Sequence, residues 1–228
     1  MGNCRAPALY ESPGKGAGHR YLLGEIPSRT GGRHLIVLAL AAMGNNLASL
    51  RASQLLEHFP SIESIIMVGI AGGVPCPSKL EEHVRLGDIV VSNQQGVIQY
   101  DFTKETITEI VYRNPPRPPG ATLWEGVEFL AASEIRGKRP WLNTIDRTLK
   151  KWKINRPPAD SDVLTSTEDP RSQIPHPQDP MRIPGQPKVF IGPIASANTL
   201  LKNPYKRDQL RDKFGVKAIE METSGIAD

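Results

Sequence analysis

The stretch SIIMVGI at residues 64–70, followed directly by AGG at residues 71–73, decides the fold that we expect for this chain. A nearly continuous apolar run of this length is typical of a strand that is buried on both faces. The run HLIVLALA at residues 34–41 has the same character, and residues 44–58 between the two runs repeat apolar side chains with helical period. Strand, helix and strand at this spacing predict a βαβ unit with two parallel strands.

The rest of the chain continues this alternation of strands and helices. Apolar runs predict strands over residues 86–92, 96–102, 188–194 and 216–221, and helical spacing predicts helices over 121–136, 141–152 and 206–214. We therefore expect the α/β class. We expect residues 1–20 to be a tail and residues 21–228 to form one domain, with a helical and Pro-rich excursion over 103–187.

Composition limits the classes of partner. The chain has 228 residues, 39% of them hydrophobic, and a formal net charge of +4. This small charge supports a nucleic-acid partner no better than an anionic small molecule, and Lys and Arg are not clustered between aromatic residues. The two cysteines, Cys4 and Cys76, make neither a disulfide framework nor a metal-binding spacing. The sequence contains no apolar run long enough to cross a membrane. We expect a cytoplasmic protein that binds no metal, cofactor, nucleic acid or membrane.

Three short turns follow three of the predicted strands. Glycines at residues 71–73 let a ligand approach backbone amides, although such glycines are as often only conformational. Ser196 begins a turn of small residues that suits a ligand ring, but capping of the next helix explains it better. Glu220 and Glu222 share one face of a strand and suit a ribose diol, or merely mark the strand's exit into solvent. Because ligands bind where parallel strands end, the three turns together favour a ligand site.

Five ordered motifs follow one another along the chain: AAMGNNLASLRASQLLEHF (41–59), VGIAGGV (68–74), VRLGDIVVS (84–92), GPIASANTLLK (192–202) and AIEMETSGIAD (218–228). Together they resemble the superfamily of purine and uridine phosphorylases and methylthioadenosine/S-adenosylhomocysteine nucleosidases. The stretches 68–75 and 98–102 resemble the branch found as sensor or effector modules of multidomain bacterial and fungal proteins. This resemblance implies a three-layer α/β/α sandwich around a mixed, largely parallel sheet, and cleavage of an N-glycosidic bond through an oxocarbenium-like cation.

The resemblance also implies roles for single residues. Glu222 would hold the ribose hydroxyls and Met221 would pack against the sugar, while Glu220 is adjacent. The glycine turn would line the base, and Ser196 would flank the purine together with the backbone after it. The implied nucleoside-binding residues are Ala71, Gly72, Gly73, Ser196, Leu200, Leu201, Glu220, Met221 and Glu222.

The chain departs from the family pattern at two points: the residues that would bind the acceptor of the ribosyl group, and the general acid that would protonate the base. Met67 and Ile70 stand where phosphorylases carry an Arg and a Ser or Thr, and neither side chain can bind a phosphate dianion. Water is therefore the expected acceptor rather than phosphate, although Ile70 also replaces the Ser of nucleosidases. The helix and strand that lead to the family's catalytic Asp are expected beyond Asp228, so no catalytic residue is assigned and impaired cleavage is expected.

Two functions of different classes remain open. The first is a purine nucleosidase, with a phosphorylase as its near variant. The second is a non-catalytic nucleoside-sensing module of a signalling or defence protein, and a nucleic-acid binder ranks last. The expected partners are a purine nucleoside with water or phosphate as co-substrate. Because relatives assemble, we also expect a homo-oligomer.

Overall fold

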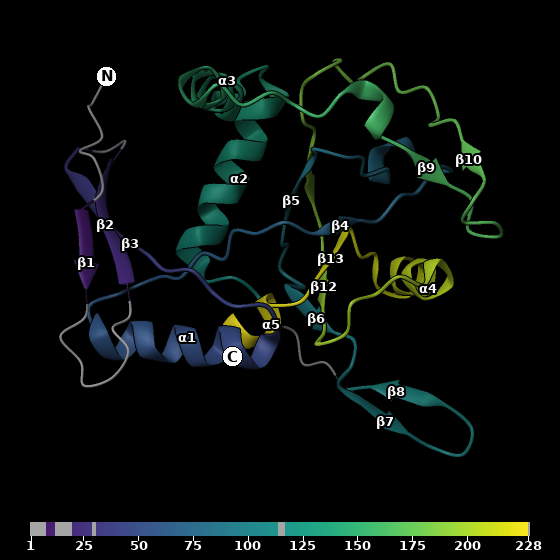
Figure 1. Ribbon diagram of the computed structural model, residues 1–228, viewed down its shortest axis with the longest axis horizontal. Coiled ribbons are helices and arrows are strands. Elements are labelled where there is room, and N and C mark those ends of the chain that lie inside the picture. Colours follow the sequence, from purple (N-terminus) through teal and green to yellow (C-terminus); the bar gives the residue numbers. More distant parts are fainter. Residues whose placement is uncertain (1–7, 12–19, 29–30, 114–116, 228) are drawn as a thin grey trace.

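A computed structural model describes residues 8–11, 20–28, 31–113 and 117–227 (Figure 1). The helices of these residues are α1 Asn45–His58, α2 Ala121–Ile135, α3 Pro140–Trp152, α4 Pro204–Phe214 and α5 Thr223–Ile226, with 3-10 turns η1 Leu80–Glu82 and η2 Ala159–Ser161. The strands are β1 Ala8–Glu11, β2 Arg20–Pro27, β3 Arg33–Leu38, β4 Gly72–Gly73, β5 Ile89–Val91, β6 Val97–Gln99, β7 Thr103–Glu105, β8 Ile110–Tyr112, β9 Leu164–Thr165, β10 Gln173–Ile174, β11 Val189–Ile191, β12 Ile194–Ser196 and β13 Ala218–Glu220.

A four-stranded mixed sheet in the order β4-β13-β12-β6 organises the domain. Strand β12 is parallel to both β13 and β6, whereas β4 is antiparallel to β13. A parallel pair, β5 with β11, continues this part of the molecule. Helices α1 and α5 pack together near the end of the mixed sheet, and α4 lies along its other side (Figure 1). The expected α/β class with a mixed sheet is confirmed.

The apolar core joins the mixed sheet to α4. Its buried side chains come from β6, β12, α4 and the segments next to them. They are Val74, Ile98, Tyr100, Ala195, Ala197, Leu210 and Val216. The core therefore fixes β6, β12 and the start of β13 relative to one another, and these strands carry the candidate site.

The two apolar runs that suggested a βαβ unit form a different arrangement. Run 34–41 contributes β3, which pairs with β2 in an antiparallel hairpin, and Leu35 in it is 81% exposed. Residues 61–71, all of which the structure describes, form no strand, and Ile70 is 99% exposed. The expected parallel pair is therefore wrong. An apolar run indicates a tendency to form a strand but does not determine which strand it pairs with. A strand that is adjacent in sequence can satisfy the backbone hydrogen-bonding groups of the run by forming a hairpin, and closing the short loop between them costs little entropy.

Part of the segment expected to be a tail forms a strand, and one helix begins earlier than expected. Within residues 1–20, Ala8–Glu11 form β1 and pair with β2, while residues 1–7 and 12–19 lie outside the described residues. Helix α4 begins two residues before the expected start at residue 206, because the Asn203 side chain accepts the N–H groups of Tyr205 and Lys206. It ends at Gly215, whose φ of 70° is the left-handed conformation that commonly stops a helix.

Ion pairs fasten the Pro-rich part of the chain to the strands beside it. Asp162 pairs with Arg85 at 2.6 Å, and Arg182 pairs with the buried carboxylate of Asp88 at 2.8 Å. Both partners, Arg85 and Asp88, precede β5 directly. None of the described helices is long and apolar enough to cross a membrane.

Candidate functional site

Two parallel strands end side by side and begin the candidate site. The register of β12 and β13 places Ser196 opposite Glu220, so the segments that leave both strands emerge at the same edge of the sheet. Helix α5 starts directly after β13, and the start of α1 packs against it. Three segments that are distant in sequence therefore meet where parallel strands end, which is the usual position of ligand sites in α/β proteins.

Glu222 reaches the start of α1 with one of its two carboxylate oxygens. The backbone N–H of Gly44 donates to Glu222 Oε1 at 3.0 Å. Gly44 has φ 104° and ψ 142°, a conformation that is almost restricted to glycine. Within the described residues, Oε2 of Glu222 has no hydrogen bond. A half-buried carboxylate is thus held by one oxygen, and the other oxygen is left as an acceptor.

Glu220 has a different role from Glu222. Its Oε2 accepts the backbone N–H groups of Glu222 and Thr223, both at 2.8 Å, and so satisfies free donors at the start of α5. Oε1 of Glu220 is buried and has no partner in the part of the chain that the structure describes. Glu220 therefore positions the backbone of Glu222 through Oε2, and its Oε1 is left as an acceptor.

Ser196 is fully buried and belongs to a polar centre with Asn45. Its Oγ donates to Asn45 Oδ1 at 2.9 Å and accepts the N–H of Ser224 at 3.3 Å. Asn198 Oδ1 in turn accepts the backbone N–H of Asn45 at 2.9 Å. Sequence reasoning identified Ser196 but not Asn45. The only local signal was the Gly-Asn pair at the start of a predicted helix, a pattern that is also typical of ordinary helix starts.

The glycine turn lies on the far side of β13 from Ser196. Gly72 pairs with Ile219, and because β4 and β13 are antiparallel, Ala71 comes next to the end of β13 that leads to Glu222. An ideal Cβ on Gly73 would lie 3.1 Å from Val84 Cγ1, so this glycine permits close packing. The turn therefore borders the same edge of the sheet without contacting Ser196 directly.

The remaining predicted contacts are spread around this edge. Leu200 is 65% exposed, whereas Leu201 is half-buried and packs against the core. Met221 is half-buried between Glu220 and Glu222. Tyr100 supports the segment before Leu200, because its hydroxyl donates to the carbonyl oxygen of Thr199 at 3.0 Å. Burial raises the pKa of Tyr100 to about 12, so the phenol keeps its donating proton at neutral pH.

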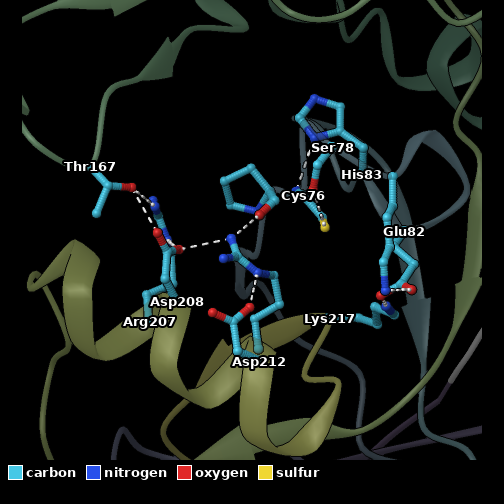
Figure 2. A network of polar contacts seen from close by, with 12 residues as sticks. Cys76, Ser78, Glu82, His83, Thr167, Arg207, Asp208, Asp212 and Lys217 are labelled. Carbon is cyan, nitrogen blue, oxygen red and sulfur yellow. Dashed lines mark hydrogen bonds and ion pairs between the residues drawn. The ribbon is translucent and has the colours of Figure 1, made fainter.

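The segment after the glycine turn is held by hydrogen bonds from several elements, part of which Figure 2 shows. The N–H of Val74 donates to the carbonyl of Lys217, and Arg211 from α4 donates to the carbonyl of Pro75 at 2.9 Å. The N–H of Cys76 donates to Nδ1 of His83 at 3.0 Å. Three successive residues are thus fixed by the residue before β13, by α4 and by the turn that follows η1, which keeps the glycine turn beside β13.

No group of three or more metal-ligating side chains occurs among the described residues. Met67 and Ile70, at the positions where the resemblance places phosphate ligands, present apolar side chains. What the edge of the sheet offers is a carboxylate, a buried carboxamide, a hydroxyl and exposed backbone at the glycine turn. This is an α/β domain with a neutral-to-anionic polar site that suits a ligand rich in hydroxyl donors.

Comparison with known proteins assigns the family. The family model of the phosphorylase superfamily matches residues 5–228, so the chain belongs to this superfamily. It is similar to a nucleotide-binding leucine-rich repeat (NLR)-like protein of Hyaloscypha variabilis, with 28% identity over 95% of this chain and 22% of that protein. It is also similar to a 5'-methylthioadenosine/S-adenosylhomocysteine nucleosidase of Mycobacterium bovis, with 26% identity over 85% of this chain and 63% of the nucleosidase. The chain therefore spans less than two thirds of either relative.

A solved structure shows the same fold. The 5'-methylthioadenosine/S-adenosylhomocysteine nucleosidase from S. pneumoniae, determined with a transition-state inhibitor, superposes with a TM-score of 0.55 and 18% sequence identity. The alignment covers 97% of this chain and 70% of that chain. The α/β architecture expected from the sequence motifs is therefore the architecture of nucleosidases.

Proposed function

We propose that this domain binds a purine nucleoside where β12 and β13 end, and that it hydrolyses the N-glycosidic bond. The observation that carries the proposal is the Glu222 carboxylate, of which one oxygen is held by Gly44 while the other is left as an acceptor. A carboxylate at this point suits the paired hydroxyl donors of a ribose. Relatives named as nucleosidases support the same substrate class.

Glu222 would also favour the cleavage step. Departure of the base leaves positive charge on the ribosyl ring, and a fixed negative charge beside the hydroxyls stabilises that charge in the transition state. Water is the proposed acceptor, because the apolar Met67 and Ile70 stand where the resemblance places phosphate ligands. We assign the sugar to Glu222 and assign no described residue as the proton donor to the base.

Nucleoside sensing without cleavage is the second candidate function. The NLR-like relative favours it, since the matched region forms 22% of that protein. The two functions share the binding site and differ only in turnover.

Turnover and its phosphate dependence separate these functions. The native chain is incubated with methylthioadenosine, adenosine or inosine, with and without phosphate, and release of free base is measured together with binding by calorimetry. Base release without phosphate supports hydrolysis, and release only with phosphate means a phosphorylase. Binding without release supports sensing. Absence of both binding and release would reject the nucleoside proposal.

Replacing Glu222 with alanine is expected to weaken adenosine binding roughly 10- to 100-fold. The variant loses hydrogen bonds to a charged acceptor, each of which contributes about 1.5–3 kcal/mol. Glu222→Gln keeps the shape but not the charge and should give a smaller loss. Glu57→Ala serves as the matched control, because Glu57 is exposed near the other end of α1. Calorimetric dissociation constants that are equal for native chain and Glu222→Ala would contradict the assignment.

A further inference from the structure

The side chain of Asn45 has a fixed orientation. Its Oδ1 is 3.0 Å from the backbone nitrogen of Gly225 and 2.9 Å from Oγ of Ser196. A backbone N–H can only donate, so the atom that faces Gly225 must be the carboxamide oxygen. Two donors from two different segments therefore converge on one oxygen, and the amide cannot be turned over without losing the bond from Gly225.

This carboxamide joins the segments that make the proposed site. Asn45 follows Gly44, whose N–H holds Glu222, and its own N–H is held by Asn198. Gly225 packs directly on the Asn45 backbone, since an ideal Cβ there would lie 1.9 Å from the Asn45 carbonyl oxygen. The position of the Gly44 amide relative to Glu222 is thus set by contacts that pass through Asn45.

The donor end of the same carboxamide is not used within the described residues. Asn45 is 4% exposed, and its buried Nδ2 has no hydrogen-bond partner there. Buried Ser224 Oγ and Glu220 Oε1 are likewise without partners in that part of the chain. An unsatisfied buried donor costs about 1–3 kcal/mol. This polar centre therefore contains one donor and two oxygens that no group of the described residues uses.

We propose that Asn45 is a positioning residue for Glu222, and that it sets the preference of the site for a ribose over a sugar that lacks the hydroxyls. The inference rests on the proposed function, because the preference exists only if a nucleoside binds there. Asn45 acts through the Gly44 amide: when the carboxamide is lost, the start of α1 is no longer fixed against Ser196 and Gly225, and the Glu222 carboxylate loses its fixed donor.

The test compares adenosine with 2′,3′-dideoxyadenosine. The dissociation constant of 2′,3′-dideoxyadenosine divided by that of adenosine measures what the ribose hydroxyls contribute to binding. General destabilisation of the protein affects both nucleosides alike and leaves this ratio unchanged. We expect Asn45→Ala to lower this ratio roughly tenfold, toward the ratio of Glu222→Ala. Asn46→Ala is the matched control, since the neighbouring Asn46 is exposed on the same helix turn. The double variant Asn45→Ala/Glu222→Ala should lose little more than Glu222→Ala alone.

The outcomes separate the inference from the function on which it rests. If Glu222→Ala lowers the ratio and Asn45→Ala leaves it unchanged, or if the two losses add, the positioning role is overturned. If the native chain binds neither nucleoside, the proposed function fails. In that case hydrogen exchange of the Gly44 amide in the free chain shows whether Asn45 still fixes this contact: exchange in Asn45→Ala should be faster, and unchanged exchange would reject the coupling as well.

A second variant keeps the test decisive if Asn45→Ala does not fold. Asn45→Asp retains an acceptor oxygen for the donors of Ser196 and Gly225, which would also hydrogen-bond its carboxylate. It should therefore keep most of the adenosine preference. Loss of the preference in folded Asn45→Asp would mean that Asn45 acts through its free Nδ2 donor rather than by positioning Glu222.

Discussion

Replacing Gly225 with alanine is expected to destabilise the domain by about 3 kcal/mol or more. An added Cβ would lie 1.9 Å from the carbonyl oxygen of Asn45 and 2.7 Å from its carbonyl carbon. Both are backbone atoms at the start of α1, so a side-chain rotation cannot relieve the clash. Either α5 or α1 must shift, and the hydrogen bond from Gly225 to Asn45 Oδ1 is lost with it.

The effect is measured by thermal and urea unfolding of the native chain and two glycine variants. For a chain of this length, 3 kcal/mol corresponds to a melting temperature lower by roughly 6–12 °C. Gly126→Ala is the matched control: Gly126 lies inside α2, a Cβ there would meet nothing within 4 Å, and alanine should stabilise the helix by up to about 1 kcal/mol. A Gly225→Ala chain as stable as the native chain would show that α5 does not pack on α1 as described.

Local patterns predicted the helices better than the pairing of strands. Helices α2 and α3 start and end within one residue of the predicted bounds, because their periodicity and their flanking Gly and Pro act within the segment itself. Run 34–41 forms a strand that pairs with β2, and run 64–70 forms no strand, so the expected pairing of the two runs is wrong. Strand pairing depends on which distant segment is available, and an apolar run of a few residues does not contain that information.

The candidate site shows the same division between local and distant information. Motif resemblance pointed to Ser196 and Glu222, and the structure brings both to one edge of the sheet. Asn45 was missed because its partners Ser196 and Gly225 lie 151 and 180 residues further along the chain. Its function as a centre of hydrogen bonds exists only in the folded chain.

Acid is expected to destabilise the domain through buried His83, which contacts half-buried His176. Because the N–H of Cys76 donates to Nδ1 of His83, the proton of neutral His83 is on Nε2, and that Nε2 faces Nδ1 of His176 at 2.9 Å. Nε2 of His176 then donates to the backbone oxygen of Asp162 at 3.2 Å. A proton added to Nδ1 of His83 would therefore break its hydrogen bond with the Cys76 amide.

Several groups determine the pKa of His83. The ring belongs to a residue that is only 3% exposed, and burial lowers its pKa to about 4. His176 and the cations Arg85 and Arg182 contribute to this lowered pKa after burial, while Asp162 opposes them. An unfolded histidine has a pKa near 6.5. The unfolded chain therefore takes up this proton first as the pH falls, and stability that is complete above pH 6.5 declines until the pH reaches the folded value near 4.

The expected loss is about 1.5 kcal/mol between pH 6.5 and pH 5, and of the order of 3 kcal/mol by pH 4. The upper part of this window isolates the histidine, because carboxyl groups whose pKa is lowered, such as Asp162 and Glu82, release their contribution only below their ordinary range near pH 4. Desolvation raises the pKa of Asp162, but its hydrogen bond with Arg85 and its other favourable contacts outweigh that effect. Urea unfolding at a series of pH values measures the slope.

His83→Gln removes the titrating ring and keeps an amide that can accept from Cys76. Its stability should change less than that of the native chain between pH 6.5 and pH 5, whereas His34→Gln, at an exposed position of β3, should follow the native curve. Equal slopes for native chain and His83→Gln would place the acid-sensitive group elsewhere.

Because Cys76 follows the glycine turn by three residues, protonation of His83 releases the amide that helps to hold the turn beside β13. The protection of the Cys76 amide from hydrogen exchange, relative to its intrinsic exchange rate at the same pH, should therefore fall at pH 5 before the chain unfolds as a whole.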